Sequence, residues 1–314
     1  MLPDTSHLIV LALAEDFGAR GDVTTAALIP PDAVATAHFV NRKAGVVAGL
    51  EIIGQVFEGL KKFSLSPAGR GYREAGGEGV GLLPPSSGLR PPSPRWGEGN
   101  VVYHVEDGDH VPAQTRLATV TGSTAAILTA ERTALNFVSR LSGIATATRE
   151  LQQKIKHTKA KVCDTRKTTP GWRALEKYAV KCGGGENHRM GLYDMVMIKD
   201  NHIAAVGDIS AAVARAQEFS PDVPIAVEVE NLDQLRAALN ARADRIMLDN
   251  MSVELMREAV QIAAGKAVIE ATGGVTADNI VAIAETGVDF ISSGWITHSA
   301  PILDIGLDFA EKGA

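Results

Sequence analysis

Residues 161–202 have the sequence KVCDTRKTTPGWRALEKYAVKCGGGENHRMGLYDMVMIKDNH, and the fold can be worked out from this stretch. It opens and closes with short apolar runs, 162–164 and 195–198, of the kind that form β-strands. A helix is predicted between them, because Pro170 lies near its start and the glycines at 183–185 follow its last apolar positions. The stretch therefore predicts a strand-helix-strand unit.

Five basic or imidazole side chains lie in this strand-helix-strand unit. They are Arg166, Lys167, His188, Arg189 and Lys199. The planar guanidinium of arginine meets a carboxylate with two parallel hydrogen bonds, so such a cluster suits a ligand with several carboxylate or phosphate groups. The unit indicates a site for a polyanion at the mouth of a parallel sheet.

The chain beyond this unit continues to alternate between strands and helices. Predicted strands are 162–164, 195–198, 225–229, 245–248, 267–271 and 290–293, and predicted helices are 203–219, 231–241, 253–264 and 277–286. Repeated strand-helix units form a parallel sheet, either an open doubly wound sheet or a barrel.

The ends of the predicted strands favour the barrel. They carry Arg166 and Lys167, Lys199, Glu228 and Glu230, Asp249 and Asn250, Glu270 and Thr272, and Ser292 and Ser293. A barrel gathers the carboxyl ends of its strands around one cavity, whereas residues without a shared role would be scattered along surface loops. We therefore predict an α/β barrel with one polar cavity.

Two turns near the C-terminus are candidates for binding a phosphate. Thr272-Gly273-Gly274 leads into the helix expected at 277–286, whose N-terminal N–H groups can face an anion. A second turn, from Gly294 to His298, follows the next strand. Phosphate sites in α/β barrels commonly use the last two strand-helix loops, which is where these turns lie.

Glu228 and Asp249 end consecutive predicted strands. Two carboxylates beside a phosphate site suit a polyol or Mg²⁺, which proteins hold with one or two carboxylates plus substrate phosphates. An ion pair with Lys167 or Lys199 is the structural alternative, and the two roles are compatible.

Two domains are predicted. Residues 1–122 are expected to form an N-terminal α+β sandwich, and residues 123–314 an α/β barrel that begins with two helices separated at Gly143. The C-terminal segment is expected to pack back on the N-terminal domain. Residues 66–100 interrupt the sandwich: positions 66–99 hold nine glycines, six prolines and four serines, a composition that predicts a mobile insert.

Composition narrows the function classes. The net charge of −6 argues against a nucleic-acid partner, for which a basic excess is normal. The first apolar run, 8–14, is too short for a signal peptide or a membrane span, so the protein is expected in the cytoplasm, without a membrane partner. Cys163 and Cys182 lack the spacing of metal ligands and are predicted to be reduced packing residues.

The central stretch from Asp164 to His202, together with ERTALNFVSRLSGIAT at 131–146, resembles the quinolinate phosphoribosyltransferase family. The similarity covers the chain apart from residues 66–100. It implies an N-terminal sandwich, an incomplete α/β barrel, and a homodimer in which the N-terminal region of one subunit closes the barrel of the other. The activity implied is transfer of phosphoribose from phosphoribosyl pyrophosphate to quinolinate with decarboxylation, which gives nicotinate mononucleotide, CO2 and pyrophosphate for NAD biosynthesis, with Mg²⁺ as cofactor.

The resemblance also implies roles for individual residues. It assigns the two carboxylates of quinolinate to Arg166, His188, Arg189 and Lys199, with Arg132 from the neighbouring subunit. It assigns phosphoribosyl pyrophosphate to Thr165, Lys167, Glu228, Asp249, Thr272, Gly273, Gly274, Gly294 and His298. Among these, Lys167, Glu228 and Asp249 are the catalytic candidates, and the two carboxylates would hold Mg²⁺ through substrate or water. Thr272 stands where the family more often has serine, which keeps the hydroxyl, and the insert is foreign to the family pattern.

Two alternatives stay open on the sequence. The chain could be a related phosphoribosyltransferase that acts on another anionic ring. It could also be a non-catalytic anion-binding barrel, although such a protein has no need of Glu228 and Asp249 at successive strand ends.

Overall fold

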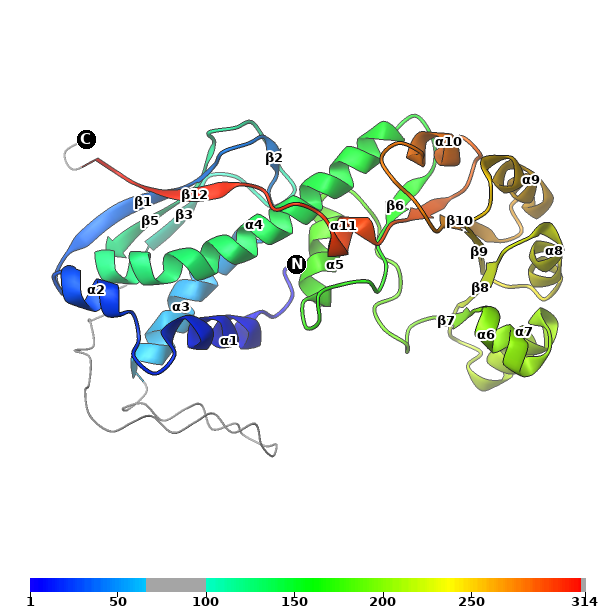
Figure 1. Cartoon of the computed structure of the whole chain (residues 1–314), viewed down its shortest axis with the longest axis horizontal. Coiled ribbons are helices and arrows are strands. Elements are labelled where there is room, and N and C mark those ends of the chain that lie inside the picture. The colour runs from blue at the N-terminus through cyan, green and yellow to red at the C-terminus, as the bar shows by residue number, and fades with distance from the viewer. Residues whose placement is uncertain (66–99, 312–314) are drawn as a thin grey trace. The chain divides into compact units, whose positions relative to one another are not determined.

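The computed structural model describes residues 1–65 and 100–311 of the chain (Figure 1). The protein divides into two compact units. The first comprises Met1–Ser142 and Ile302–Ala314, and the second comprises Gly143–Pro301. The insert expected at 66–100 lies outside the described residues, except for Asn100, which opens a strand.

The first unit is built on an antiparallel sheet with the strand order β12-β1-β5-β3. These strands are β1 (Val34–Asn41), β3 (Asn100–Tyr103), β5 (Arg116–Ser123) and β12 (Ile305–Phe309), and β2 (Gly45–Val46) pairs separately with β4 (His110–Val111). Helices α1 (Ser6–Phe17), α2 (Val23–Leu28) and α3 (Glu51–Leu65) lie on one side of the sheet in Figure 1. The predicted sandwich is confirmed, and the last strand of the chain completes its sheet.

Helix α4 (Thr124–Lys154) runs without interruption, so the predicted break at Gly143 is wrong. A glycine inside a helix costs about 0.5–1 kcal/mol relative to alanine. Gly143 and its neighbours Ser142 and Ile144 are buried, and this packing outweighs that cost. The two units divide within α4, between 142 and 143, whereas the sequence places the domain boundary between 122 and 123, at the start of the helix.

The second unit contains a parallel sheet with the strand order β6-β11-β10-β9-β8-β7. Its strands are β6 (Lys161–Cys163), β7 (Val196–Ile198), β8 (Ile225–Val229), β9 (Arg245–Asp249), β10 (Val268–Thr272) and β11 (Phe290–Ser292). Each strand from β7 to β10 pairs with its successor, and β11 returns to β6, so the strands follow a barrel that is open between β6 and β7. The predicted incomplete α/β barrel is confirmed.

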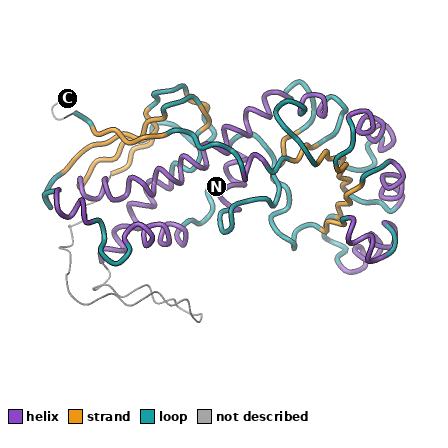
Figure 2. The backbone as a smooth tube through the Cα atoms, viewed as in Figure 1, coloured by secondary structure: helices purple, strands orange, loops and turns teal. Residues whose placement is uncertain are grey.

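Helices of the second unit lie on the outer side of the curved sheet in Figure 2. They are α6 (Asp200–Val206), α7 (Ile209–Phe219), α8 (Leu232–Asn240), α9 (Val253–Ala263) and α10 (Ile280–Ala284); α5 (Arg173–Cys182) and the short α11 (Trp295–His298) follow β6 and β11. Among the described residues, no helix is both long and apolar enough to cross a membrane.

Two of the predicted helices differ from the structure. The helix expected at 203–219 is two helices, because Gly207, with φ 117°, ends α6 and the Asp208 carboxylate caps α7 by accepting from Ala211 N–H. The helix expected at 277–286 covers only Ile280–Ala284, because a turn precedes it in which Asn279 Oδ1 accepts from Thr276 N–H (2.8 Å).

Candidate active site

The segment before His188 lies along the open edge of the barrel. Glu186 N–H donates to the Val162 carbonyl (2.8 Å), and Asp164 N–H donates to the Glu186 carbonyl (3.1 Å), which makes a parallel bridge beside β6. His188 and Arg189 follow this bridge directly and are thereby brought to the carboxyl end of β6. The segment 186–189, which carries the predicted ligands His188 and Arg189, therefore lies beside β6 where a closed barrel would have another strand.

Asp164 and Lys177 form a fully buried ion pair next to this segment. Asp164 also accepts from Asn187 Nδ2 (2.6 Å) and His188 N–H (2.9 Å), and Lys177 Nζ donates to the His188 carbonyl (2.8 Å). Burial raises the pKa of the Asp164 carboxyl, and the Lys177 ammonium and these hydrogen bonds oppose that rise. The ion pair thus holds the N–H and the carbonyl of His188 at once.

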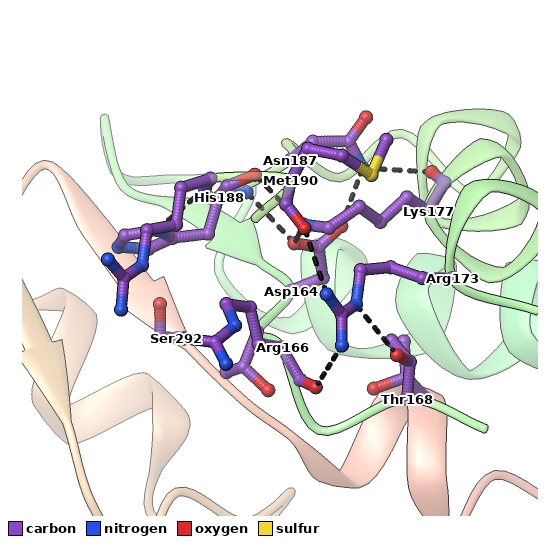
Figure 3. Close-up of polar contacts among 12 residues, drawn as sticks. Asp164, Arg166, Thr168, Arg173, Lys177, Asn187, His188, Met190 and Ser292 are labelled. Carbon is purple, nitrogen blue, oxygen red and sulfur yellow. Dashed lines mark hydrogen bonds and ion pairs between the residues drawn. The ribbon is translucent and has the colours of Figure 1, made fainter. Parts of the chain in front are cut away.

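Arg173, in the first turn of α5, connects two loops of the site (Figure 3). Its Nε donates to Thr168 Oγ1 (3.0 Å) and its Nη2 to the Arg166 carbonyl (3.4 Å), in the loop after β6. Its Nη1 donates to the Met190 carbonyl (3.1 Å), in the loop after Arg189. One guanidinium therefore fixes the spacing of the backbone around Arg166 and Arg189.

Arg166 and Arg189 interact as like charges. Arg189 Nη1 donates to the Met195 carbonyl (3.0 Å), while its Nε is buried and has no hydrogen-bond partner among the described residues. Burial lowers the pKa of the Arg189 guanidinium, and the charge of Arg166 lowers it further. Asp194 opposes part of this shift. A bound anion would stabilise the charged guanidinium further.

A cavity of about 90 Å³ lies at the carboxyl ends of β8 and β9. It is lined by Asp200, Ile203, Glu228, Glu230, Gln234 and Asp249. Lys199 Nζ donates to Glu228 Oε2 (2.8 Å), which is the ion pair that the sequence left open as an alternative. His202 Nδ1 accepts from Lys199 N–H (3.0 Å), so His202 holds the start of α6.

The two glycine-containing turns lie beside other predicted ligands. Thr272 is paired with Asp249 across β10 and β9, and a Cβ at Gly273, where φ is 87°, would strike the Asn250 side chain. A Cβ at Gly294 would come within 2.9 Å of Lys167 Cδ and 3.2 Å of the His298 ring. The positive φ favours glycine at position 273, whereas a side chain at position 294 would require Lys167 to shift.

The helix expected directly behind Gly274 is absent at that point, since α10 begins at Ile280. The predicted start of this helix is therefore wrong by three residues, and anion binding at this turn stays a prediction. The backbone N–H groups available there belong to the turn itself, whose Gly274 carbonyl accepts from Asn279 Nδ2 (2.9 Å). Thr165 follows β6, and its Oγ1 accepts from Lys167 N–H (3.0 Å).

Glu270 lies in the interior of β10 and is fully buried, although the sequence grouped it with the strand ends. Its Oε1 accepts from Ser292 Oγ. Its Oε2 lies 3.2 Å from His188 Nε2 and 2.5 Å from Arg245 Nε, at ion-pair distances but without hydrogen-bond angles. The carboxylate thus connects three strands or segments beneath the site.

Arg132 is exposed on α4 and belongs to the first unit, whereas the other predicted ligands belong to the second. Thr129 Oγ1 donates to Asp22 Oδ2 (2.9 Å), and Thr133 Oγ1 donates to Asp16 Oδ2 (2.9 Å). The helix surface around Arg132 is therefore anchored to the polar segment at 15–25.

Sequence reasoning missed the residues that hold the site together. They are Asp164, Arg173, Lys177 and Arg245. The available signal was a charged residue inside an apolar stretch: Lys177 lies on the buried face of α5, and Arg245 opens the apolar strand β9. Such residues are almost never buried unless they are paired.

The carboxylates of Glu228 and Asp249 fit a Mg²⁺ ion that is bound mainly by other ligands. Among the residues that the structure describes, no group of three or more His, Cys, Asp or Glu side chains is arranged to hold a metal ion. Glu228 and Asp249 line one cavity, and Lys199 contacts one oxygen of Glu228. Two carboxylates suit an ion that is held mainly by substrate phosphates and water.

Comparisons with known proteins agree with the resemblance. The chain matches the family models for the C-terminal domain of quinolinate phosphoribosyl transferase over residues 144–308 and for its N-terminal domain over residues 97–142. It is 41% identical over 300 residues to the nicotinate-nucleotide pyrophosphorylase (carboxylating) of Mycobacterium leprae (strain TN), which covers 95% of this chain and 94% of that protein.

Further relatives agree with this match. The probable nicotinate-nucleotide pyrophosphorylase (carboxylating) of Bacillus subtilis (strain 168) is 48% identical over 208 residues, which is 66% of this chain and 72% of the relative. The structure of the nicotinate-nucleotide pyrophosphorylase from Francisella tularensis superposes with a TM-score of 0.84 at 38% identity, covering 98% of this chain and 96% of that one. On this evidence of sequence and fold, the chain belongs to the quinolinate phosphoribosyltransferase family.

Proposed function

We propose that this chain is a transferase that moves phosphoribose from phosphoribosyl pyrophosphate to quinolinate with decarboxylation, and so produces nicotinate mononucleotide, CO2 and pyrophosphate for de novo NAD biosynthesis. The observation that carries the proposal is Arg189, whose Nε is buried without a hydrogen-bond partner in the described part of the chain and whose pKa is lowered by burial and by the charge of Arg166. A dianionic pyridine supplies the missing negative charge. Family membership supports the same reaction.

Quinolinate is proposed to bind at the open edge of the barrel. Its carboxylates would be held by Arg166, Arg189 and Lys199, with Arg132 supplied by the second subunit of a homodimer. His188, whose two ring nitrogens face Arg189 N–H and Glu270, would contribute by placing Arg189. The support is geometric: Arg173 donates to the carbonyls of Arg166 and Met190, and so holds the backbone beside Arg166 and Arg189. A rigid set of cations binds an anion without first having to be ordered.

Phosphoribosyl pyrophosphate is proposed to bind across the neighbouring strand ends. Its 5′-phosphate would lie on the two glycine turns, Thr272–Gly274 and Gly294–His298, and its pyrophosphate beside Thr165 and Lys167. The ribose hydroxyls and Mg²⁺ would face Glu228 and Asp249. The close approach of Gly294 to Lys167 and His298, and the pairing of Thr272 with Asp249, support one continuous site.

The chemistry this site would perform is positioning and charge stabilisation. The pyridine nitrogen attacks the anomeric carbon of the ribose as pyrophosphate leaves, so the protein must align the two reactants. Lys167 would neutralise charge on the departing pyrophosphate, and Mg²⁺, when bound, would supply further charge neutralisation there. The glycosylated nitrogen is cationic and stabilises the carbanion that remains when CO2 departs, after which a proton completes the ring.

The decisive experiment measures both products. Purified protein is incubated with quinolinate, phosphoribosyl pyrophosphate and Mg²⁺, and CO2 and nicotinate mononucleotide are quantified together. Equal amounts of the two products are expected, with little turnover of nicotinate, because a monoacid leaves the spare cations unpaired. Turnover of another anionic ring instead of quinolinate would identify a related transferase, and binding without pyrophosphate release would indicate a non-catalytic barrel.

A further inference from the structure

We propose that Glu270 is a positioning residue, which together with Arg245 fixes the tautomer of His188 and, through it, the backbone of Arg189. None of the ligand assignments above includes Glu270 or Arg245. The substrate-affinity arm of this inference rests on the proposed function, whereas its spectroscopic arm stands on the geometry alone.

The tautomer follows from two contacts of the His188 ring. Arg189 N–H donates to His188 Nδ1 (2.7 Å), so Nδ1 accepts and carries no proton. The proton of the neutral ring is therefore on Nε2, which is buried and lies 3.2 Å from Glu270 Oε2. Carboxylates commonly orient a histidine by facing the N–H opposite the nitrogen in use.

Glu270 can do this only because its charge is compensated. The side chain is inaccessible to solvent, and the Arg245 guanidinium, 12% exposed, lies 2.5 Å away and stacks 4.3 Å from the centre of the Phe290 ring. Arg245 holds Glu270 as a carboxylate, and a carboxylate attracts the Nε2 proton of His188. Burying two charges in a sheet has a desolvation cost, so the arrangement is unexpected for packing alone.

Other charged groups face His188 through its backbone. Asp164, at the end of β6, accepts from His188 N–H (2.9 Å), and Lys177, from α5, donates to its carbonyl (2.8 Å). These contacts place the main chain and do not touch the ring, which Arg189 N–H constrains on its Nδ1 side alone. The contact with Glu270 supplies the remaining constraint.

Replacing the carboxylate by an amide is a sharp test. Glu270 Oε1 accepts from Ser292 Oγ, and Oε2 faces two donor groups. Glutamine has the same shape but only one oxygen, so Glu270→Gln sets an NH2 group against a donor. The matched control is Glu285→Gln, since Glu285 lies at the same distance, 3.2 Å, from His157 on the exposed surface.

The experiment records the side-chain ¹⁵N shifts of the histidines in the full-length protein at pH 7, with His188 assigned by His188→Gln. We expect protonated Nε2 and bare Nδ1 for His188 in the wild type and in Glu285→Gln, and loss of this preference in Glu270→Gln. In Arg245→Met, Glu270 loses the neighbouring positive charge that keeps it a carboxylate, so loss of the same tautomer preference is expected there as well. Unchanged His188 shifts in both variants would overturn the proposal.

The kinetic arm separates positioning from general damage. For Glu270→Gln we expect the KM for quinolinate to rise about tenfold or more, which corresponds to the loss of one hydrogen bond to a charged group. The KM for phosphoribosyl pyrophosphate is expected to stay within about twofold of the wild-type value. An equal rise for both substrates would refute positioning. If Glu270→Gln does not fold, the double variant Glu270→Gln/Arg245→Met removes both buried charges and gives the same readouts. If the wild type does not turn over quinolinate, the proposed function fails, and the ¹⁵N shifts still decide this inference.

Discussion

Arg189 has a buried Nε atom without a hydrogen-bond partner among the described residues, and this makes it the most informative single side chain to remove. Arg189→Ala is expected to raise the KM for quinolinate roughly 10- to 150-fold, because a hydrogen bond to a charged group contributes about 1.5–3 kcal/mol. Steady-state kinetics with quinolinate as the varied substrate measures this.

Arg257→Ala is the control for that change. Arg257 is an exposed arginine on α9 of the same unit, and its removal is expected to leave both KM values unchanged. Wild-type quinolinate affinity in Arg189→Ala would remove this residue from the site.

The buried carboxyl of Glu270 is expected to make the unfolding free energy of the protein depend on pH. Burial alone would raise the pKa of this carboxyl, but the His188 and Arg245 contacts and the Ser292 hydroxyl outweigh it and hold the pKa below its ordinary value. A carboxyl with a lowered folded pKa stabilises the protein fully above its unfolded pKa, about 4.3, and loses this contribution as the pH falls through the folded pKa.

The difference in unfolding free energy between wild type and Glu270→Gln is therefore expected to be largest at pH 5–7 and to shrink below about pH 4.3. Urea denaturation at a series of pH values measures it. A difference that stays constant down to pH 3 would show that the charge of Glu270 is not what stabilises the fold.

Helix α5 joins the loops of the site, and Arg173 in its first turn is the side chain that makes the connection. Arg173→Met is expected to lower the unfolding free energy by about 1–2 kcal/mol, since its bonds are partly exposed, and to raise hydrogen exchange in the loops at 166–169 and 189–195. Exchange measured by mass spectrometry resolves these peptides.

Lys181→Ala is a matched control on the same helix. Lys181 forms an exposed ion pair with Glu186 (2.6 Å), and such pairs contribute about 0–1 kcal/mol. If both variants alter exchange in the two loops equally, Arg173 has no special role in connecting them.

The glycines that end α5 have separate functions. A Cβ at Gly183 would clash with the Ala145 carbonyl and come within 2.7 Å of Thr148 Cβ, so α4 and α5 can approach only because Gly183 has no side chain. Gly184 has φ 84° and open space around it. Gly183→Ala is expected to cost about 1–3 kcal/mol, as overpacking does.

Gly184→Asn is expected to cost less than Gly183→Ala, because asparagine tolerates a positive φ. Thermal unfolding of both variants measures the order. The reverse order would mean that backbone conformation, and not close approach, requires these glycines.

A homodimer with shared sites makes a quantitative prediction for the assembled protein. If Arg132 completes the site of the partner, Arg132→Ala and Arg166→Ala damage the same site from different subunits. Mixing the two inactive variants at equal amounts is expected to restore about a quarter of the wild-type activity, because half of the dimers are mixed and each has one intact site. No recovery after subunit exchange would place Arg132 outside the partner's site.

The sequence predicts the barrel and its strand-end groups well because both depend on local patterns. Lys199 and Glu228 follow or end apolar runs, and the parallel pairing of β7 and β8 makes them neighbours. The pairing of Asp164 with Lys177, and of Glu270 with Arg245, depends on which faces of α5 and the sheet meet, and no local spacing encodes this. The unbroken α4 shows the same limit, because burial around Gly143 overrides helix propensity.

The gap between β6 and β7 has a chemical consequence. In a closed cylinder of strands, the N–H and carbonyl groups at this seam would be used up in strand pairing, and the side chains would alternate strictly between inside and outside. Here one bridge at Glu186 satisfies β6, and the chain is then released from strand geometry just before His188 and Arg189. The gap in the barrel therefore frees the backbone at His188 and Arg189 from the strict inside-outside alternation of a strand.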